Sequence, residues 1–385
     1  MERRRFGKTG LDVSVLTLGT MRLLHGWDAP HDHLPDDSLE STFAIVSTAL
    51  SAGINLIETA RGYGKSERLL GAVLPRIGVP RARYHIMTKA PPAPNGREMR
   101  QWIDDSLTRL GCDRIDLFAL HGLNREAHFQ ALGAKNGVMT ALRQARDEGL
   151  IGAIGFSGHA TPPLLLRLIA TGQFDFVNLH YYRFRRANHA AVALAQALDM
   201  GVLIISPNDK GGRLYDPPER LRLLTAPLLP AQFNERWLLA QSGVHTLSIG
   251  LSEPAHLALH LEGLRHGPAW GQTEQEIAWR LTAAESRSAL LDCGQGCFAC
   301  LPCPQEIEIP EILRMDHLIH CFDMTHFARY RYGMMRPGDH WVPGARVETC
   351  DRCGDCLPRC PRGLAIPELL AGARWRMDPE GGSST

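Results

Sequence analysis

The sequence has no long apolar run, no large excess of charge of one sign and no apolar leader segment. None of its 385 residues lies in a run near the roughly 20 apolar residues that span a bilayer, so we expect no membrane partner. The formal net charge of +1 gives no electrostatic reason to expect nucleic acid as a partner. The basic residues 1–6 are followed by no apolar segment, which argues against a secretory signal.

Cysteine is abundant, and eight of the ten cysteines form two runs that each end in Cys-Pro. The runs are Cys293, Cys297, Cys300 and Cys303 before Pro304, and Cys350, Cys353, Cys356 and Cys360 before Pro361. The second run has the C-x2-C-x2-C-x3-C-P spacing of bacterial [4Fe–4S] sites, in which the fourth cysteine ligates the other cluster. The spacing predicts [4Fe–4S] clusters, two in number, and an electron-transfer role. Reduced ligating thiols also indicate a cytoplasmic location.

Structural zinc and disulfides are the alternatives for these cysteines. Structural zinc sites are usually built from two separated C-x2-C pairs, and three cysteines in one tight run fit a single ion poorly. Cys293 precedes Cys297 by one residue more than the other spacings of its run, so its role as a ligand, and the number of clusters, stay open. Cys112 and Cys321 stand alone and are interpreted as small buried hydrophobic residues.

Upstream of the cysteines, short apolar runs alternate with longer amphipathic segments. The eight predicted strands are 15–18, 54–57, 84–88, 115–120, 152–156, 176–179, 202–206 and 246–249. Eight strands, each followed by a helix-length segment, predict a (β/α)8 TIM barrel with a parallel sheet covered on both faces. Residues 4–6 and 13, separated by glycines, predict a hairpin that closes the barrel floor. An open doubly wound sheet would carry G-x-G-x-x-G after its first strand, and none follows here.

Four polar residues fall at or after the ends of successive predicted strands. Glu58 ends the second strand, Lys89 the third and His121 the fourth, and Tyr63 follows Glu58 by five residues. Catalytic side chains of barrels stand at these strand ends. Because a tyrosine has a pKa of about 10, acid–base work near neutrality needs a cation such as Lys89, held in place by Glu58. With His121 to orient the substrate oxygen, the set predicts protonation of a carbonyl oxygen during reduction, or the reverse.

Further segments carry a family resemblance. They are residues 18–21, 58–71, 88–89, 116–121, 154–159, Asn178 and 205–207. Together with the strand-end residues, they make roughly the first 265 residues resemble the aldo-keto reductases, which carry an Asp-Tyr-Lys-His tetrad. Glu58 stands at the aspartate position. With its cysteine-rich tail, the chain is most similar to the branch with a C-terminal ferredoxin-like dicluster domain.

The resemblance implies a role for each matched residue. Tyr63 would be the general acid, Lys89 would modulate its pKa, and His121 would orient the substrate. The implied cofactor contacts are Gly19, Thr20 and Met21 near the substrate, Ser157 and Asn178 at the nicotinamide carboxamide, Ser206, Lys210, Gly211 and Gly212 along the diphosphate, and Gly250 and Ser252 at the adenosine end. The cofactor would be NADP(H) or NAD(H), and the sequence leaves the choice between them open.

These observations predict an α/β protein with a barrel and a small appended domain. We expect a barrel over residues 1–270, a linking helix over 271–291, a mainly α-helical ferredoxin-like domain over 292–375 and a disordered tail over 376–385. The predicted function is NAD(P)-dependent interconversion of a small-molecule carbonyl and alcohol, coupled to iron–sulfur electron transfer, with a redox protein as a candidate partner. The alternatives are a non-catalytic subunit that binds nucleotide or transfers electrons, and a plain carbonyl reductase with a structural metal tail.

Three arginines follow the sixth predicted strand, namely Arg183, Arg185 and Arg186. They could bind an acidic group of the substrate. We favour the other interpretation, in which they form a solvated rim of exposed charges on the surface.

Overall fold

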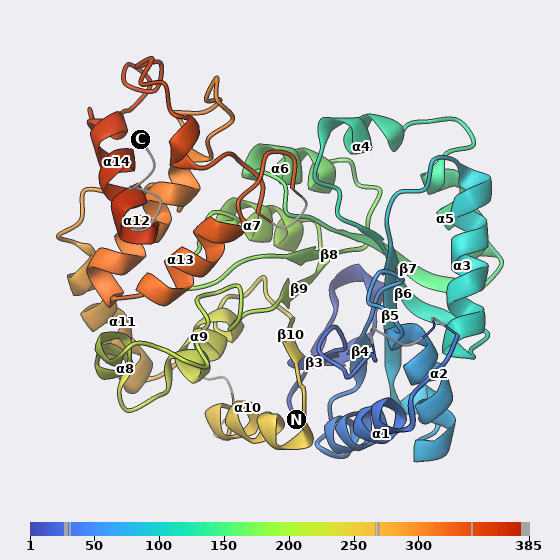
Figure 1. The fold of residues 1–385 in the computed structure, drawn as a ribbon. Helices are drawn as coiled ribbons and strands as arrows, with labels where there is room; N and C mark the ends of the chain where they lie inside the picture. Colours follow the sequence, from blue (N-terminus) through green and yellow to red (C-terminus); the bar gives the residue numbers. More distant parts are fainter. Residues whose placement is uncertain (27–29, 31, 266, 268–269, 340–341, 379–385) are drawn as a thin grey trace. The chain divides into compact units, whose positions relative to one another are not determined.

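The computed structural model describes residues 1–26, 30, 32–265, 267, 270–339 and 342–378 (Figure 1). The chain forms two compact units that are interleaved in sequence. The first consists of Met1–Tyr181, Asn188–Pro207 and Leu238–Ala269, and the second of Tyr182–Ala187, Asn208–Trp237 and Trp270–Thr385. Two segments between barrel strands therefore belong with the cysteine-rich region and not with the strands that flank them.

The first unit contains a closed barrel of eight parallel strands, which confirms the predicted fold. The strands are β3 (Leu16–Gly19), β4 (Leu56–Glu58), β5 (His85–Ala90), β6 (Ile115–His121), β7 (Ile151–Ser157), β8 (Phe176–Leu179), β9 (Gly201–Ile205) and β10 (Thr246–Gly250). Each strand pairs with the next in the chain, and β10 closes the ring by pairing with both β9 and β3. β4 and β8 are buried along their whole length, because both faces of a parallel sheet are covered.

The helices of this unit pack on the outer side of the strands (Figure 1). They are α1 (Asp36–Ser51), α2 (Ser66–Ile77), α3 (Gly96–Leu110), α4 (Glu126–Ala131), α5 (Val138–Asp147), α6 (Pro162–Ala170), α7 (His189–Ala197) and α10 (Leu257–Gly263). In α3, the Asn95 side chain accepts a hydrogen bond from the Glu98 N–H at 3.0 Å, and Gly111 ends the helix in the left-handed conformation. Met99 and Ile103, four residues apart, place the buried face of α3 against the barrel.

A short hairpin closes the floor of the barrel, as predicted. It consists of β1 (Arg3–Arg5) and β2 (Asp12–Ser14), which pair antiparallel. Phe6 and Val13 are fully buried and pack with side chains from the barrel interior, namely Leu56, Met87, Leu117, Ala119, Phe176 and Leu203. Gly7 has a φ of +52°, and a Cβ there would lie 2.4 Å from the backbone nitrogen of Gly201. Only glycine fits this turn beneath the strands.

The described elements of the second unit are mainly helical. They include α8 (Glu219–Thr225), α9 (Pro230–Leu239), α11 (Gln272–Glu285), α12 (Ile309–Phe322), α13 (Thr325–Met334) and α14 (Ile366–Met377). α9 ends two residues inside the first unit. α11 lies within the predicted linking helix. α14 covers residues 376 and 377 of the segment predicted to be disordered, and residues 379–385 of that segment lie outside the described residues.

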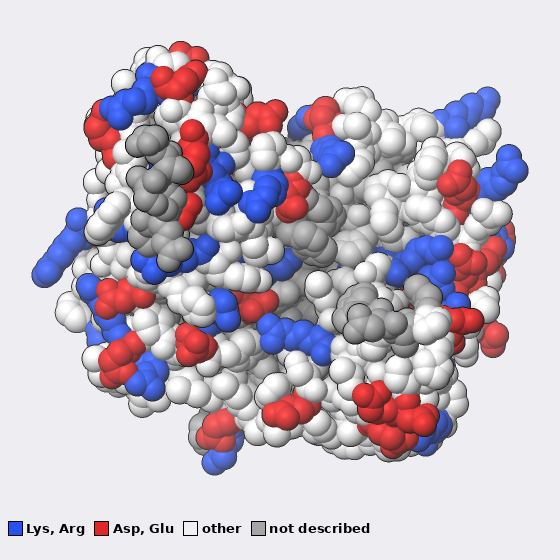
Figure 2. All heavy atoms as spheres, in the orientation of Figure 1, with Lys and Arg blue, Asp and Glu red and all other residues white. Residues whose placement is uncertain are grey.

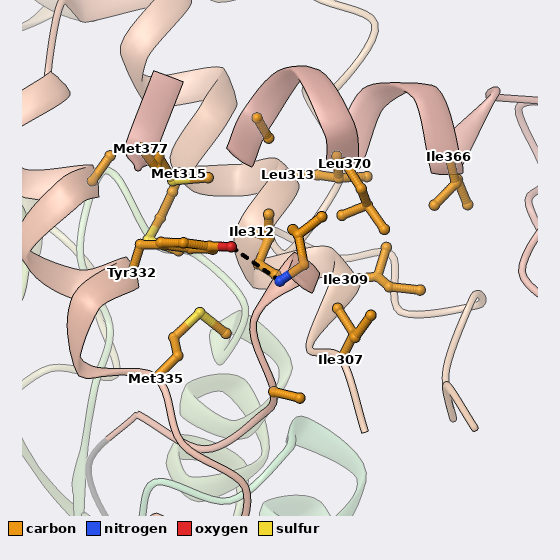
Figure 3. Close-up of a cluster of buried hydrophobic side chains, with 14 of the residues drawn as sticks. Ile307, Ile309, Ile312, Leu313, Met315, Tyr332, Met335, Ile366, Leu370 and Met377 are labelled. Carbon is orange, nitrogen blue, oxygen red and sulfur yellow. Dashed lines mark hydrogen bonds between the residues drawn. The ribbon is translucent and has the colours of Figure 1, made fainter. Parts of the chain in front are cut away.

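Helices α12, α13 and α14 share one apolar core, shown in Figure 3. Ile312 and Leu313 of α12, Tyr332 of α13 and Leu370 of α14 are each at most 1% exposed. The Tyr332 hydroxyl accepts a hydrogen bond from the Val347 N–H at 3.0 Å, which ties α13 to the segment before the second cysteine run (Figure 3). Six of the clustered cysteines contact or belong to this core, namely Cys293, Cys300, Cys303, Cys350, Cys356 and Cys360. The core therefore supports both cysteine runs.

A buried ion pair anchors the segment Tyr182–Ala187 inside the second unit. Arg183 makes two hydrogen bonds to Glu285, of 2.8 and 2.9 Å, and the two side chains are 3% and 2% exposed. Arg186 approaches the same carboxylate at 3.9 Å. The solvated-rim interpretation is therefore wrong for Arg183, because its charge is already matched by a carboxylate from α11, far away in the sequence.

The surface shown in Figure 2 carries both signs of charge, and the described helices are short. Acidic and basic side chains are interspersed over the face shown in Figure 2. The longest described helix, α1, has 16 residues, fewer than the roughly 20 that cross a bilayer. Across the described ranges, no helix combines the length and the apolar character needed to cross a membrane.

Candidate active site

A buried lysine–carboxylate pair lies at the C-terminal ends of β4 and β5. Glu58 ends β4, Lys89 is the penultimate residue of β5, and they are 2% and 0% exposed. The Lys89 Nζ forms an ion pair with Glu58 Oε1 and donates a hydrogen bond to the Thr59 carbonyl at 2.7 Å. Glu58 Oε2 accepts a hydrogen bond from the Ser248 hydroxyl at 2.8 Å. The additional methylene of glutamate, relative to aspartate, therefore does not keep the carboxylate from Lys89.

The ring of Tyr63 lies against this pair. The Lys89 Nζ stands over the Tyr63 ring, 4.7 Å from its centroid, in a cation–π arrangement. The imidazole of His121, the last residue of β6, meets the same ring edge-on, with centroids 5.7 Å apart and an interplanar angle of 84°. Tyr63 is 6% exposed, and within the described residues its hydroxyl makes no hydrogen bond. The structure thus brings together the four residues that the sequence singles out.

Burial sets the direction of the pKa shifts in this group. It raises the pKa of Tyr63 above the ordinary value and lowers the pKa of Lys89 well below its own. The carboxylate of Glu58 and the carbonyl of Thr59 are the groups that favour the charged form of Lys89. Burial is the cause of the raised pKa of Tyr63, and the role of Lys89 in modulating that pKa stays a prediction.

Gly19 and Thr20 fix the end of β3 beside Glu58. The Thr20 N–H and hydroxyl both donate to the Glu58 carbonyl at 3.0 Å. A Cβ on Gly19 would lie 2.6 Å from Ser248 Oγ and 3.3 Å from Glu58 Oε2. Glycine at this position therefore leaves room for the hydrogen bond between Ser248 and Glu58.

Replacing Gly19 with alanine tests this close packing. We expect Gly19→Ala to lower the free energy of unfolding by about 1–3 kcal/mol, because a methyl group must displace Ser248 or the Glu58 carboxylate. The matched control is Gly62→Ala, where a Cβ meets no atom within 4 Å, and a change within about 0.5 kcal/mol is expected. Urea unfolding followed by circular dichroism measures both. Equal stabilities of the two variants would contradict the proposed packing.

Ser157 and Asn178 are adjacent across β7 and β8, in register with each other. Asn178 is fully buried, and its Oδ1 has no hydrogen-bond partner, while its Nδ2 approaches the Met87 sulfur at 3.3 Å. The Ser157 hydroxyl accepts a hydrogen bond from the Gly122 N–H at 3.2 Å. A buried amide oxygen without a partner is costly, so Asn178 Oδ1 is suited to accept a hydrogen bond from the amide of a ligand.

The other predicted cofactor residues lie at further strand ends and in the second unit. Met21 is 50% exposed just after β3, Gly250 ends β10 and Ser252 is exposed after it. Ser206 follows β9 with a φ of +49°, a conformation that costs energy for a residue other than glycine. Lys210, Gly211 and Gly212 belong to the second unit.

A pair of histidines beside these residues is not among the sequence predictions. His159 and His180 have ring centroids 4.2 Å apart, and their Nε2 atoms are 3.3 Å apart. One ring must donate and the other accept in this contact. His159 and His180 follow the ends of β7 and β8, two residues after the paired Ser157 and Asn178. This register could have revealed the pair, whereas the Ser248–Glu58 hydrogen bond had no sequence signal.

The eight clustered cysteines fall into two sets around the helical core of the second unit. Burial and then the thiols of Cys297 and Cys360 raise the pKa of Cys293 to about 11. Burial and then the thiols of Cys293, Cys297 and Cys356 raise the pKa of Cys300 to about 12, and Cys293 acts most strongly of the three. The second set, Cys303, Cys350, Cys353 and Cys356, lines one cavity. Each set thus combines three cysteines of one run with the last cysteine of the other run.

The cysteines are free thiols, and the structure therefore does not contain the disulfides that the sequence left open. Among the described residues, no three Cys, His, Asp or Glu side chains converge closely enough to hold a metal ion. Cys321 is 3% exposed in the apolar interior, which fits its interpretation as a small hydrophobic residue. Its sulfur lies 3.6 Å from His317 Nδ1.

The chain matches a known family over much of the barrel. The sequence model described as "Aldo/keto reductase family" matches residues 15–217, so the matched range ends before both cysteine runs. The chain is 29% identical over 293 residues to the 6-dehydroglucose reductase of Novosphingobium aromaticivorans, covering 68% of this chain and 90% of that protein. It is 37% identical over 239 residues to an aldo-keto reductase of Mycobacterium marinum, covering 60% and 78% respectively.

A solved structure shows the same fold. The holo form of an aldo-keto reductase from Bacillus halodurans superimposes with a TM-score of 0.60 at 21% identity, covering 73% of this chain and 96% of that one. At this identity the likeness concerns the fold alone. The sequence matches carry the assignment, and their named members are reductases. The chain therefore belongs to the aldo/keto reductase family and is an oxidoreductase.

Proposed function

We propose that this protein interconverts a small-molecule carbonyl and its alcohol with NADP(H) or NAD(H), and that its cysteine-rich unit carries two [4Fe–4S] clusters. The observation that supports the first part best is the buried Lys89–Glu58 pair directly against the ring of Tyr63. A fully buried ion pair has a large desolvation cost, and such sites are concentrated where proteins do acid–base chemistry.

Tyr63 is the proposed proton donor. Its hydroxyl has no hydrogen-bond partner among the described residues and so is available to a substrate oxygen. Burial raises its pKa, which makes phenolate formation unfavourable until a stronger base appears. An alkoxide is such a base, so the proton moves only as negative charge develops on the substrate oxygen. Lys89 lowers the cost of the resulting phenolate, and Glu58 holds Lys89 in position.

His121 and Asn178 are the proposed positioning groups. His121 lies edge-on to Tyr63 and can donate a hydrogen bond to the same substrate oxygen. The nicotinamide cofactor supplies or removes hydride when bound. Its carboxamide suits Asn178 Oδ1, which is buried without a partner, and Ser157 beside it. The resemblance further assigns Gly19, Thr20, Met21, Ser206, Lys210, Gly211, Gly212, Gly250 and Ser252 to the rest of this cofactor.

The two cysteine sets fit two clusters better than single ions. Structural zinc sites are usually built from two separated C-x2-C pairs, whereas here each set takes three cysteines from one tight run and the fourth from the other run, as iron–sulfur dicluster spacing requires. Cys293, Cys297, Cys300 and Cys360 would hold one cluster and Cys303, Cys350, Cys353 and Cys356 the other, and such clusters transfer single electrons.

Hydride transfer moves an electron pair, whereas each cluster moves one electron. We infer that the clusters serve a redox protein partner or stabilise the second unit. Neither role requires the clusters to take up the two electrons of the hydride one at a time. Their apolar support by α12, α13 and α14 is compatible with both roles. Free thiols as ligands favour a cytoplasmic location.

Anaerobic purification followed by metal analysis and nucleotide titration tests this proposal. We expect a brown protein with about eight iron and eight sulfide per chain, which binds NADPH or NADH and oxidises one of them with members of a carbonyl panel. A colourless, zinc-loaded protein would contradict the cluster assignment and leave the reductase in place. Absence of nucleotide binding and turnover in an iron-loaded protein would contradict the reductase assignment.

A further inference from the structure

A groove lies on the outer side of the barrel, between α2 and α3. It has a volume of about 360 Å³, and its walls include Arg68 and Ala72 of α2, Asp105 and Arg109 of α3, and Leu34, which precedes α1. All of these residues belong to the first unit. Sites for small molecules usually have volumes of about 300–1,000 Å³, so the groove is large enough for a small organic ligand.

The wall of the barrel separates this groove from the catalytic pair. Thr88 and Lys89 are consecutive in β5, so their side chains point to opposite faces of the sheet. The Thr88 hydroxyl donates to Glu67 Oε1 of α2 at 2.6 Å, whereas Lys89 pairs with Glu58 inside the barrel. The groove therefore lies on the other side of the wall from Tyr63, and an inference about it goes beyond the proposed function.

Arg68 is a side chain of the groove that lacks a counter-charge. It is half-buried, and its Nε is shielded from solvent without a hydrogen-bond partner. Throughout the described ranges it makes no ion pair. A guanidinium group has five N–H donors, and a buried donor without an acceptor costs free energy. Arg68 is therefore suited to donate to an acceptor that enters the groove.

The ion pairs around Arg68 leave one positive charge over. Arg109 reaches Glu67 at 3.4 Å and Asp105 at 3.9 Å, both longer than the usual 2.7–3.2 Å of a hydrogen bond. Asp105 lies closer to Arg61, at 3.0 Å. Together with Arg68, three guanidinium groups thus share two carboxylates. An anion with a single charge would balance this group.

We propose that the groove binds a small organic acid, whose carboxylate is held by Arg68 and Arg109. Guanidinium groups match a carboxylate through paired, charge-assisted hydrogen bonds. Leu34 and Ala72 offer apolar contacts to the rest of the acid. A phosphate ester carries up to two negative charges and so exceeds the single charge that the site has to spare.

Arg68→Met tests the proposal in the full-length, cluster-loaded protein. Isothermal titration with sodium benzoate at low ionic strength should show a dissociation constant about 10- to 100-fold higher than for wild type, because charge-assisted hydrogen bonds are lost. Ala72→Leu should also weaken binding, since it fills the groove and leaves every charge in place. The matched control is Arg97→Met. Arg97 is exposed on α3 and likewise has no ion pair within the described part of the chain, but it is not part of the groove, so the constant should not change.

Further titrations locate the bound benzoate and define its chemistry. Tyr63→Phe should bind benzoate like wild type, and a loss of binding there would overturn the proposal by placing the ligand in the catalytic site. Inorganic phosphate that binds more tightly than benzoate through Arg68 would overturn the carboxylate assignment. Equal weakening by Arg97→Met would reduce the effect to general attraction by surface charge. Absence of benzoate binding to wild type would refute the site outright.

Thermal unfolding separates ligand binding from a structural role of Arg68. Without benzoate, Arg68→Met should be at least as stable as wild type, because it removes a buried donor that has no partner. Benzoate should raise the melting temperature of wild type and leave that of Arg68→Met unchanged. A lower melting temperature with unchanged benzoate affinity would overturn the proposal and make Arg68 a counter-charge for the C-terminal end of α3. If stability and affinity both fall, Ala72→Leu decides, since unweakened binding in that variant would exclude the groove.

Discussion

Replacing Tyr63 with phenylalanine should lower kcat for carbonyl reduction by about 10²- to 10⁴-fold, the usual contribution of a positioned general acid. The change removes one oxygen from a ring that Lys89 and His121 hold from two sides, and it leaves both contacts with the ring in place. The variant should therefore fold like wild type and bind NADPH with unchanged affinity. Steady-state rates with the best substrate of a carbonyl panel, beside a nucleotide titration, measure both quantities.

Tyr84→Phe is the matched control for this experiment. Tyr84 has the same 6% exposure as Tyr63, but it precedes β5 at the opposite end of that strand from Lys89. Its replacement should leave kcat unchanged. If Tyr63→Phe retains the wild-type rate, the proton donor is another group, and the ion pair of Lys89 and Glu58 needs a different explanation.

The barrel could be predicted because its strands carry their own signal. Strands covered on both faces are apolar along their length, and β8 is predicted at Phe176–Leu179, the range that the structure has. Glu58, Lys89 and His121 were then predicted at the ends of three neighbouring strands. The parallel register of β4, β5 and β6 brings the C-terminal ends of these strands together. The hairpin followed from its glycines for the same local reason.

Features that depend on distant pairs could not be predicted. Arg183 resembles a surface residue in sequence, and only the fold shows that Glu285, 102 residues later, pairs with it in the interior. The direction of the Tyr63 pKa shift likewise depends on how deeply the fold buries the ring, which no spacing reveals. The placement of the segment Tyr182–Ala187 in the second unit is equally hidden from the sequence, since its Arg183 pairs with a carboxylate of α11.

The second large effect is expected from Cys360→Ser and Cys356→Ser, which come from the same run but belong to different sets. Cys360 lies with Cys293, whereas Cys356 shares a cavity with Cys303 and Cys350. Serine keeps the size of the side chain but is a poor ligand for iron. Each variant should therefore lose about four of about eight irons, while Cys112→Ser, outside both sets, should lose none.

Combining the two serine variants separates the two sets from a single shared site. If each cysteine serves its own cluster, the double variant should lose nearly all iron, because the losses at independent sites add. It should also melt at a lower temperature, since the cysteines pack on the core of α12, α13 and α14. Iron and sulfide quantitation with visible absorbance follows the first effect, and calorimetry follows the second. Full iron retention in Cys360→Ser would remove this cysteine from the ligand set, and a double variant with no further loss than either single variant would mean that both serve one cluster.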